Sequence, residues 1–169
     1  ALDVSGEATR VVEELRQRLV TLSKTLAEIE NTSRPRVACI EWLDPLMVAG
    51  NWVPELVESA GGHDVLGVTG EHSPWIFWDT LLAADPDRIV VMPCGFDIER
   101  TREELSSVVD RSEWKSLRAV AEDRVVLVDG HAFFNRPGPR LVDSAVILAE
   151  IFHPGVCEGR HKGSGWQPL

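Results

Sequence analysis

Hydrophobic residues recur at alternating steps of three and four along the first thirty positions of the chain. This spacing predicts one face of an amphipathic helix from about residue 7 to residue 30. Charged side chains fall mostly on the other side. At about 1.5 Å per residue the helix would be roughly 36 Å long, which indicates a strut. The stripe consists of Val12, Leu15, Leu19, Leu22, Leu26 and Ile29.

From residue 34 onward, short apolar runs alternate with helical patterns. The runs of strand type are 37–42, 64–68, 88–93 and 125–129. The helical patterns are 52–60, 75–84, about 101–109, 113–123 and 141–154. Ser73-Pro74 is a candidate start for the second of these helices, and Thr101 with Glu104 is a candidate capping box. The alternation predicts an α/β fold, a three-layer Rossmann-like lobe with a mainly parallel sheet, preceded by one long backbone helix.

The pattern divides the chain into three parts. Residues 1–33 form the long connecting helix, and residues 34–155 form the α/β lobe. Residues 156–169 are polar and rich in glycine, so we expect a loose tail.

Composition excludes several classes of function. The formal net charge is −10 and the pI is near 4.9, which weighs against nucleic-acid binding and against a polybasic membrane anchor. No apolar run approaches the roughly 18–20 residues of a membrane span. The three cysteines are far apart and argue against a zinc site. We expect no metal site, no catalytic residue and no intrinsic cofactor, because nucleotide-binding loops and metalloprotease motifs are absent.

Large aromatic side chains gather in loops that follow predicted strands. In parallel sheets, ligands bind beyond the carboxyl ends of the strands. Trp42 and Trp52 lie at or just after the first strand, and Phe133 and Phe134 follow the last one. With Trp75, these rings are expected to face outward and hold a ligand.

Polar residues of the same loops are further candidates. His131 and His72 lie in loops at the predicted binding edge. Arg136, beside the two phenylalanines, would hold a carboxylate or phosphate, or form an exposed salt bridge. Asp97 and Asp129 follow strands and are expected to cap helices or turn the chain.

Residues 36–154 resemble the carboxy-terminal lobe of substrate-binding proteins of ATP-driven (ABC) importers. The resemblance is to the group that handles cobalamin, heme and iron–siderophore complexes, and most of all to cobalamin-binding proteins. The residues that carry it are RVACIEWLDPLMVAGNWVPELVESAGG (36–62), SPWIFWDTLLAADPDRIVVMPCG (73–95) and VVLVDGHAFFNRPGPRLVDSAVILAEIFHP (125–154).

The resemblance implies a clamp of two lobes joined by a rigid helix, with the ligand between the lobes. This chain would hold the connecting helix, at the end of a missing amino-terminal lobe, and one lobe. The implied ligand is cobalamin or another metal chelate, and the implied partner is the membrane permease of the importer. The implied location is periplasmic or extracytoplasmic, although the chain itself shows no signal peptide.

Individual positions carry the resemblance further. The segment AFFNR (132–136) is similar to the family's cleft loop, which places an aromatic ring and an arginine at the edge of a corrin. Phe133 and Arg136 match, whereas Ala132 stands where the family has an acidic residue. Trp75 lies near the place of a cleft tryptophan. Asp79 stands where the family carries a surface acid that docks onto the permease.

Two alternatives remain open at this point. One is a heme or iron–siderophore lobe of the same transporter class, with His131 or His72 as a heme ligand. The other is a flavodoxin-like enzyme or signalling module, which would require a phosphate-cradling loop. An isolated lobe would bind weakly and could self-associate through its exposed cleft face.

Overall fold

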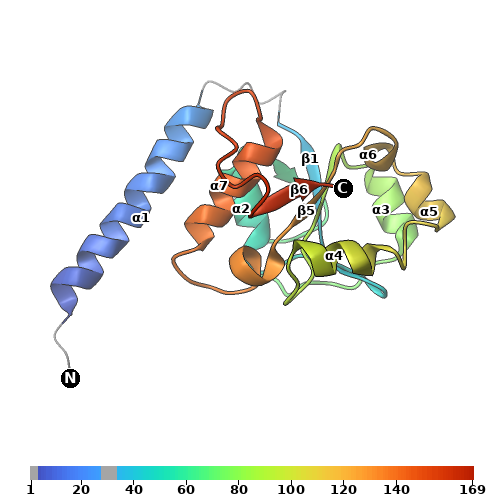
Figure 1. Ribbon diagram of the computed structural model, residues 1–169, viewed down its shortest axis with the longest axis horizontal. Coiled ribbons are helices and arrows are strands. Elements are labelled where there is room, and N and C mark those ends of the chain that lie inside the picture. The colour runs from blue at the N-terminus through green and yellow to red at the C-terminus, as the bar shows by residue number, and fades with distance from the viewer. Residues whose placement is uncertain (1–3, 28–33) are drawn as a thin grey trace.

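The chain is described by a computed structural model that covers residues 4–27 and 34–169. Helix α1 (Ser5–Leu26) leans away from the rest of the molecule toward its amino-terminal end (Figure 1). Of its side chains only Leu22 is fully buried, and Arg18 pairs with Asp143. The predicted long helix is therefore confirmed, while Ile29 and the predicted end near residue 30 lie outside the described residues.

The described residues form a six-stranded sheet in which the central strands are parallel. The strands are β1 (Arg36–Leu43), β2 (Leu46–Val48), β3 (His63–Asp64), β4 (Arg88–Val91), β5 (Val125–Val128) and β6 (Trp166–Pro168). Their order is β2-β1-β4-β5-β6, with β3 paired in parallel to the start of β1. Strands β2 and β6 are antiparallel to their neighbours. The sheet is thus mixed and mostly parallel, as the alternating pattern predicted.

Helices cover both faces of the sheet (Figure 1). One face carries α1, α2 (Val53–Ser59) and α7 (Leu141–Phe152). The other carries α3 (Trp78–Ala84), α4 (Ile98–Leu105), α5 (Ser112–Lys115) and α6 (Arg118–Ala121). Successive strand residues alternate between the two cores, since Val37 and Cys39 pack toward α7 whereas Ala38 and Ile40 pack toward α3.

Several predicted boundaries are wrong for identifiable reasons. Ser73 does not cap a helix, because its hydroxyl bonds to Gly50 and Glu41 and the chain then runs extended as far as Phe77. The cap of α4 is Asp97, which accepts a hydrogen bond from the backbone N–H of Arg100 at 2.8 Å. The patterns at 64–68 and 113–123 give, respectively, the two-residue strand β3 and the two short helices α5 and α6.

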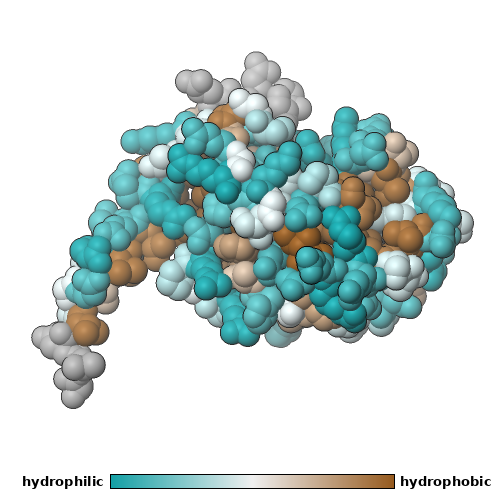
Figure 2. Space-filling view, in the orientation of Figure 1, coloured by the Kyte–Doolittle hydropathy of each residue, from teal (hydrophilic) through white to brown (hydrophobic). Residues whose placement is uncertain are grey.

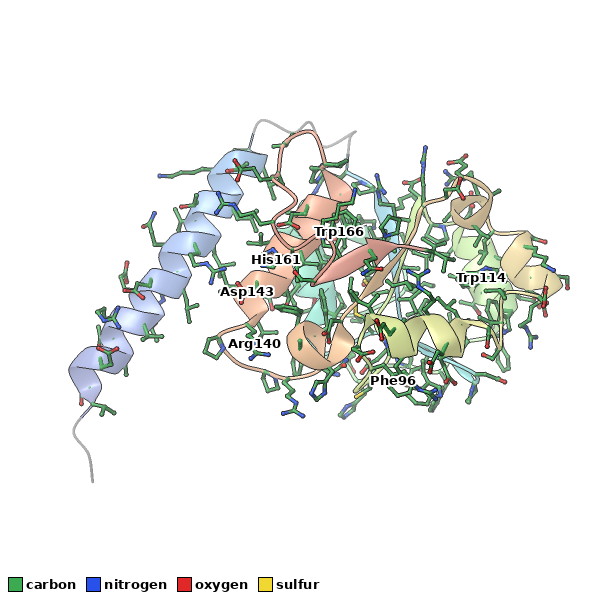
Figure 3. The ribbon with its side chains drawn as sticks, in the orientation of Figure 1. Phe96, Trp114, Arg140, Asp143, His161 and Trp166 are labelled. Carbon is green, nitrogen blue, oxygen red and sulfur yellow. The ribbon has the colours of Figure 1, made fainter. Side chains whose placement is uncertain are left out.

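The carboxy-terminal segment is not a loose tail. Residues 166–168 pair with β5 as strand β6, and Trp166 is buried. Its indole N–H donates to Glu150 on α7 at 2.8 Å. Figure 3 shows Trp166 and His161 beside α7. The glycines and polar residues around this strand hid the pairing from the sequence pattern.

Candidate ligand-binding site

The loops that follow β1, β4 and β5 meet at one edge of the sheet, the lower edge in Figure 1. They are joined there by the segment 68–77 and by the start of α2. We call this the carboxyl edge. It is an open surface in this chain, and it is the place where parallel sheets bind ligands.

Four large side chains lie next to one another across the carboxyl edge. We call them the aromatic row (Phe96, Trp42, Met47 and Trp75). The rings of Phe96 and Trp42 are 5.5 Å apart between centroids. Trp42 faces Met47 across the β1–β2 pair, and Met47 faces Trp75 in an antiparallel bridge. Trp75 is 60% exposed, and Phe77 two residues later is 83% exposed.

A β-bulge explains why Trp42 belongs to this row. Ile40 faces Val48 and Trp42 faces Met47, so Glu41 is an extra residue in β1. Ile40 and Val48 belong to the core on the α3 side, whereas Trp42 and Met47 do not. The bulge therefore turns Trp42 away from that core and toward the open edge.

The extended segment before α3 is held against β2 by backbone hydrogen bonds. Val48 donates to Pro74 at 3.1 Å, and Ile76 donates to Leu46 at 2.9 Å. Ile76 packs into the core, so Trp75 and Phe77 on either side of it point the other way. This local strand is what exposes the two rings.

Ser73 and Glu41, which are close in sequence to Trp75 and Trp42 of the row, contact each other and the backbone that leads into α2. The hydroxyl of Ser73 donates to Oε2 of Glu41 and accepts from the backbone N–H of Gly50 at 3.1 Å. A Cβ atom at Gly50 would lie only 2.5 Å from the carbonyl oxygen of Glu71, so this close approach requires glycine.

The loop after β5 forms a short π-helical turn, η2 (Gly130–Phe134). Asp129 caps it by accepting from the backbone N–H of Ala132 at 2.7 Å. Side chains from three places hold its last carbonyl groups. The donors are Arg140 to Ala132 at 3.2 Å, Ser144 to Phe133, and the indole of Trp52 to Phe134 at 3.0 Å.

The burial of these rings corrects the sequence-based expectation. Phe134 is 1% exposed and belongs to the core between α2 and α7, so the expectation that it faces a ligand is wrong. Phe133 is half-buried against the same core, with its ring edge-on to His161 at 6.1 Å. Trp52 is also half-buried there. The π-helical turn folds the loop back over α7, and only Trp75 of the five predicted rings is largely exposed.

The predicted polar residues are exposed. The side chains of His131, His72 and Arg136 have no hydrogen bond or ion pair with another described residue. Within the described part of the chain, no group of three or more histidine, cysteine, aspartate or glutamate side chains could hold a metal ion. Asp79 is exposed in the first turn of α3.

Asp64, at the end of β3, has a shifted pKa. Oδ1 of Asp64 accepts backbone N–H groups of Leu66 at 3.0 Å and Gly67 at 2.7 Å. Its Oδ2 is buried without a partner. Burial raises the pKa of Asp64 above its ordinary value, partly offset by the two backbone hydrogen bonds.

Two hollows of about 330 and 470 Å³ lie between α1 and the lobe. The larger is lined by residues such as Leu22, Val146 and His161. Neither includes a residue of the aromatic row. Cys157 lines the larger hollow, and all three cysteines are free.

Sequence reasoning missed Met47, Phe96 and Phe77. Phe96 follows a predicted strand and could have been found by the same argument that selected Trp42. Met47 lies in a three-residue strand, too short for an alternating pattern to reveal it.

The sequence matches the profile of the family described as periplasmic binding protein over residues 1–132, so the chain belongs to this family. The family is one of binding proteins rather than enzymes, and one of the structural neighbours is named as an ABC transporter substrate-binding protein. This argues against a flavodoxin-like enzyme or signalling module. Among curated proteins, none matches this chain.

Solved structures share the fold. An ABC transporter substrate-binding protein from Listeria monocytogenes is 19% identical with a TM-score of 0.76, over 89% of this chain and 58% of that one. A periplasmic heme-binding protein from Pseudomonas aeruginosa is 23% identical with a TM-score of 0.75, over 90% and 55% of the two chains. An Fe³⁺-hydroxamate transport protein from Saccharomonospora viridis is 22% identical with a TM-score of 0.68, over 89% and 51%.

The chain therefore spans between half and three-fifths of the length of these structures. It has the fold of a periplasmic binding protein lobe with its long helix. Among the described residues, no helix is both long and apolar enough to cross a membrane.

Proposed function

We propose that this chain is one lobe of a substrate-binding protein that delivers a metal chelate to an ABC importer, and that cobalamin or a related corrinoid lies against the aromatic row. The row is the observation that carries this proposal. With neighbours about 5 Å apart across the strands, its four side chains extend over roughly 15 Å. That length suits the face of a tetrapyrrole macrocycle better than a small ion.

Burial energetics favour a flat, apolar ligand on this surface. A large aromatic side chain can cover roughly 150–250 Å², worth about 4–6 kcal/mol before the ordering costs of binding. Trp75 and Phe77 are largely exposed, so much of this apolar area is still open. Arg136 and His131 are uncommitted polar groups on the neighbouring loop and would contact the ligand's edge.

Heme and iron–siderophore complexes are the alternative ligands of the same class. Neighbouring structures are named for heme, Fe³⁺-hydroxamate and molybdate. Heme would use His131 or His72 as an axial ligand, since both side chains are exposed and unpaired among the described residues. Molybdate lacks the flat apolar face that the row would cover.

Visible absorption titrations separate these ligands, because each has its own spectrum. We expect cyanocobalamin to bind more tightly than hemin or a ferric hydroxamate. Trp75→Ala and Phe133→Ala should each weaken corrinoid binding about tenfold or more, as truncation of an aromatic anchor does. Val156→Ala, which truncates an exposed apolar residue in the segment after α7, is the control. Unchanged affinity in Trp75→Ala would refute the assignment.

We assign Asp79 to docking on the membrane permease, and the protein to the periplasm or the outer face of the membrane. The support is the exposed position of Asp79 on α3 and the family to which the chain belongs. Asp79→Lys should leave chelate binding unchanged and weaken association with the detergent-solubilised permease. Equal association by both forms would contradict the assignment.

A further inference from the structure

We propose that the carboxylate of Glu41 selects chelates whose edge carries amide or hydroxyl donors and disfavours chelates whose edge carries carboxylates. This inference rests on the proposed function, because it concerns the same site. Glu41 is the bulge residue of β1, and the next residue in sequence, Trp42, belongs to the aromatic row. Its hydrogen-bond partner Ser73 lies two residues before Trp75, at the other end of the row.

Half of the Glu41 carboxylate is bound and the other half is free. Oε2 accepts the hydroxyl of Ser73. Oε1 has no hydrogen-bond partner among the described residues. The buried side-chain atoms without a partner belong to other described residues, so Oε1 is not buried and reaches solvent. No described lysine, arginine or histidine forms an ion pair with Glu41. A fixed and uncompensated negative charge therefore lies beside the row.

The position of this charge is set by the backbone. Ser73 is held by the N–H of Gly50, and the neighbouring backbone N–H of Asn51 donates to the carbonyl of Glu71 at 2.7 Å. Glu41 also uses its own carbonyl to accept from Cys94 at 3.3 Å. Because the acceptor is already oriented, little ordering remains when a ligand donor reaches it.

Nearby cations do not neutralise the charge. Arg100 lies over the ring of Phe96, at the lower edge of Figure 3, but pairs with Glu103 and Glu104. Arg140 donates to the carbonyl of Ala132. Arg136, which follows η2, has no hydrogen bond or ion pair with another described residue and so does not pair with Glu41.

The chemistry of a free carboxylate oxygen then decides between ligand edges. An ionised carboxylate only accepts hydrogen bonds, so an amide N–H or a hydroxyl satisfies it. A ligand carboxylate would meet a like charge, which costs affinity. A corrin whose periphery is amidated fits this edge, whereas a porphyrin with propionates placed toward Glu41 does not.

Two corrinoids that share the same ring and metal, and differ only in their side chains, test this proposal. One is dicyanocobyrinic acid heptaamide, and the other is dicyanocobyrinic acid with free carboxylates. Equilibrium dialysis with absorbance readout measures both, at ionic strength high enough to screen distant charges. We expect the wild-type chain to prefer the heptaamide by at least about tenfold. Glu41→Gln keeps an oxygen for Ser73 but removes the charge, and it should lose most of this preference, while Glu41→Asp should keep it.

Glu122→Gln is the matched control, because Glu122 is exposed just before β5 and therefore lies at the opposite edge of the sheet. It removes the same charge and should leave the preference unchanged. If Glu41→Gln and Glu122→Gln keep the same preference, Glu41 does not select the ligand edge, although the proposed function stands. If the wild-type chain binds neither corrinoid, the proposed function fails and this inference fails with it.

Discussion

The indole N–H of Trp52 donates a hydrogen bond to the carbonyl oxygen of Phe134 over 3.0 Å. This contact joins the start of α2 to the last residue of η2, which are 82 positions apart in sequence. Phe134 is buried and Trp52 half-buried, so the two side chains support the carboxyl edge from beneath. The exposed surface of the edge is formed by the aromatic row.

Removing this hydrogen bond should loosen η2. In Trp52→Phe the carbonyl of Phe134 loses its indole donor in a partly buried place, which typically costs about 1–3 kcal/mol. We expect a lower free energy of unfolding in denaturant titrations and faster amide hydrogen exchange across residues 130–135. Trp42→Phe is the control for stability, because the Trp42 indole donates to Asp44 at an exposed position. Equal losses in both variants would mean that the Trp52 contact has no special role.

Glu150 fastens the carboxy-terminal segment to α7. Its carboxylate is 1% exposed and accepts three N–H groups, from the His161 backbone at 3.1 Å, His161 Nδ1 at 2.9 Å and the Trp166 indole at 2.8 Å. Glutamine has one oxygen acceptor and would turn its own N–H₂ group toward these donors. Glu150→Gln should therefore lower the free energy of unfolding by about 2–3 kcal/mol.

The same variant should release β6 before the rest of the sheet, seen as lost exchange protection at residues 166–168. Glu103→Gln, which removes an exposed pair with Arg100, should change stability by less than about 0.5 kcal/mol. A Glu150→Gln chain that is as stable as the wild type would show that the carboxylate is not needed.

The contribution of Asp64 to the stability of the folded chain depends on pH. Burial raises the pKa of Asp64 in the folded state, so the folded state disfavours its ionised form. The contribution of Asp64 to the free energy of unfolding is fully present below the pKa of the unfolded state, about 3.9. It is lost as the pH rises through the higher pKa of the folded state. Asp64→Asn keeps an oxygen for the N–H groups of Leu66 and Gly67 and does not titrate.

We therefore expect Asp64→Asn to be more stable than the wild type at neutral pH, on the order of 1 kcal/mol, with the advantage shrinking as the pH falls toward 4. Thermal or denaturant unfolding of both chains across this range gives the difference directly. Other carboxylates titrate equally in both chains and cancel. An advantage that stays constant with pH would contradict the raised pKa.

The repeating elements were predictable because their burial leaves a regular trace in the sequence. The runs at 88–93 and 125–129 became β4 and β5, and 141–154 became α7, since each is buried on both sides or along a continuous face. β6 was not predictable, because its three residues depend on pairing with β5 rather than on a pattern of their own. The same holds for β2, which follows β1 after a tight turn.

The position of the candidate site could be predicted from the sequence, but its detail could not. The rule that ligands bind beyond parallel strands selected loops that the structure brings together at the carboxyl edge, yet it could not say which side of a loop faces the solvent. For Phe133 and Phe134 that choice is made by the π-helical turn, whose shape depends on Trp52, Ser144 and Arg140 from other elements. For Trp42 it is made by the bulge at Glu41, which no local pattern announces.

Exposure of Trp75 in the row, and of Phe77 beside it, should make the isolated chain self-associate. Trp75 and Phe77 are among the most exposed large apolar residues described, and a contiguous apolar patch of this kind is rare on a monomer. Figure 2 also shows brown apolar residues along α1. Val12 and Leu19 of this helix are exposed. We expect sedimentation equilibrium to show a dimer whose fraction increases with protein concentration.

Variants of each surface distinguish which of the two forms the contact between copies of the chain. Trp75→Gln with Phe77→Ser should shift the chain toward the monomer if these two rings form the contact, whereas Val12→Ser with Leu19→Ser should have the smaller effect. A saturating corrinoid should act like the Trp75/Phe77 double variant, because ligand and partner chain would cover the same face. A chain that stays monomeric at the highest soluble concentration would show that these exposed rings are too few to hold a second copy.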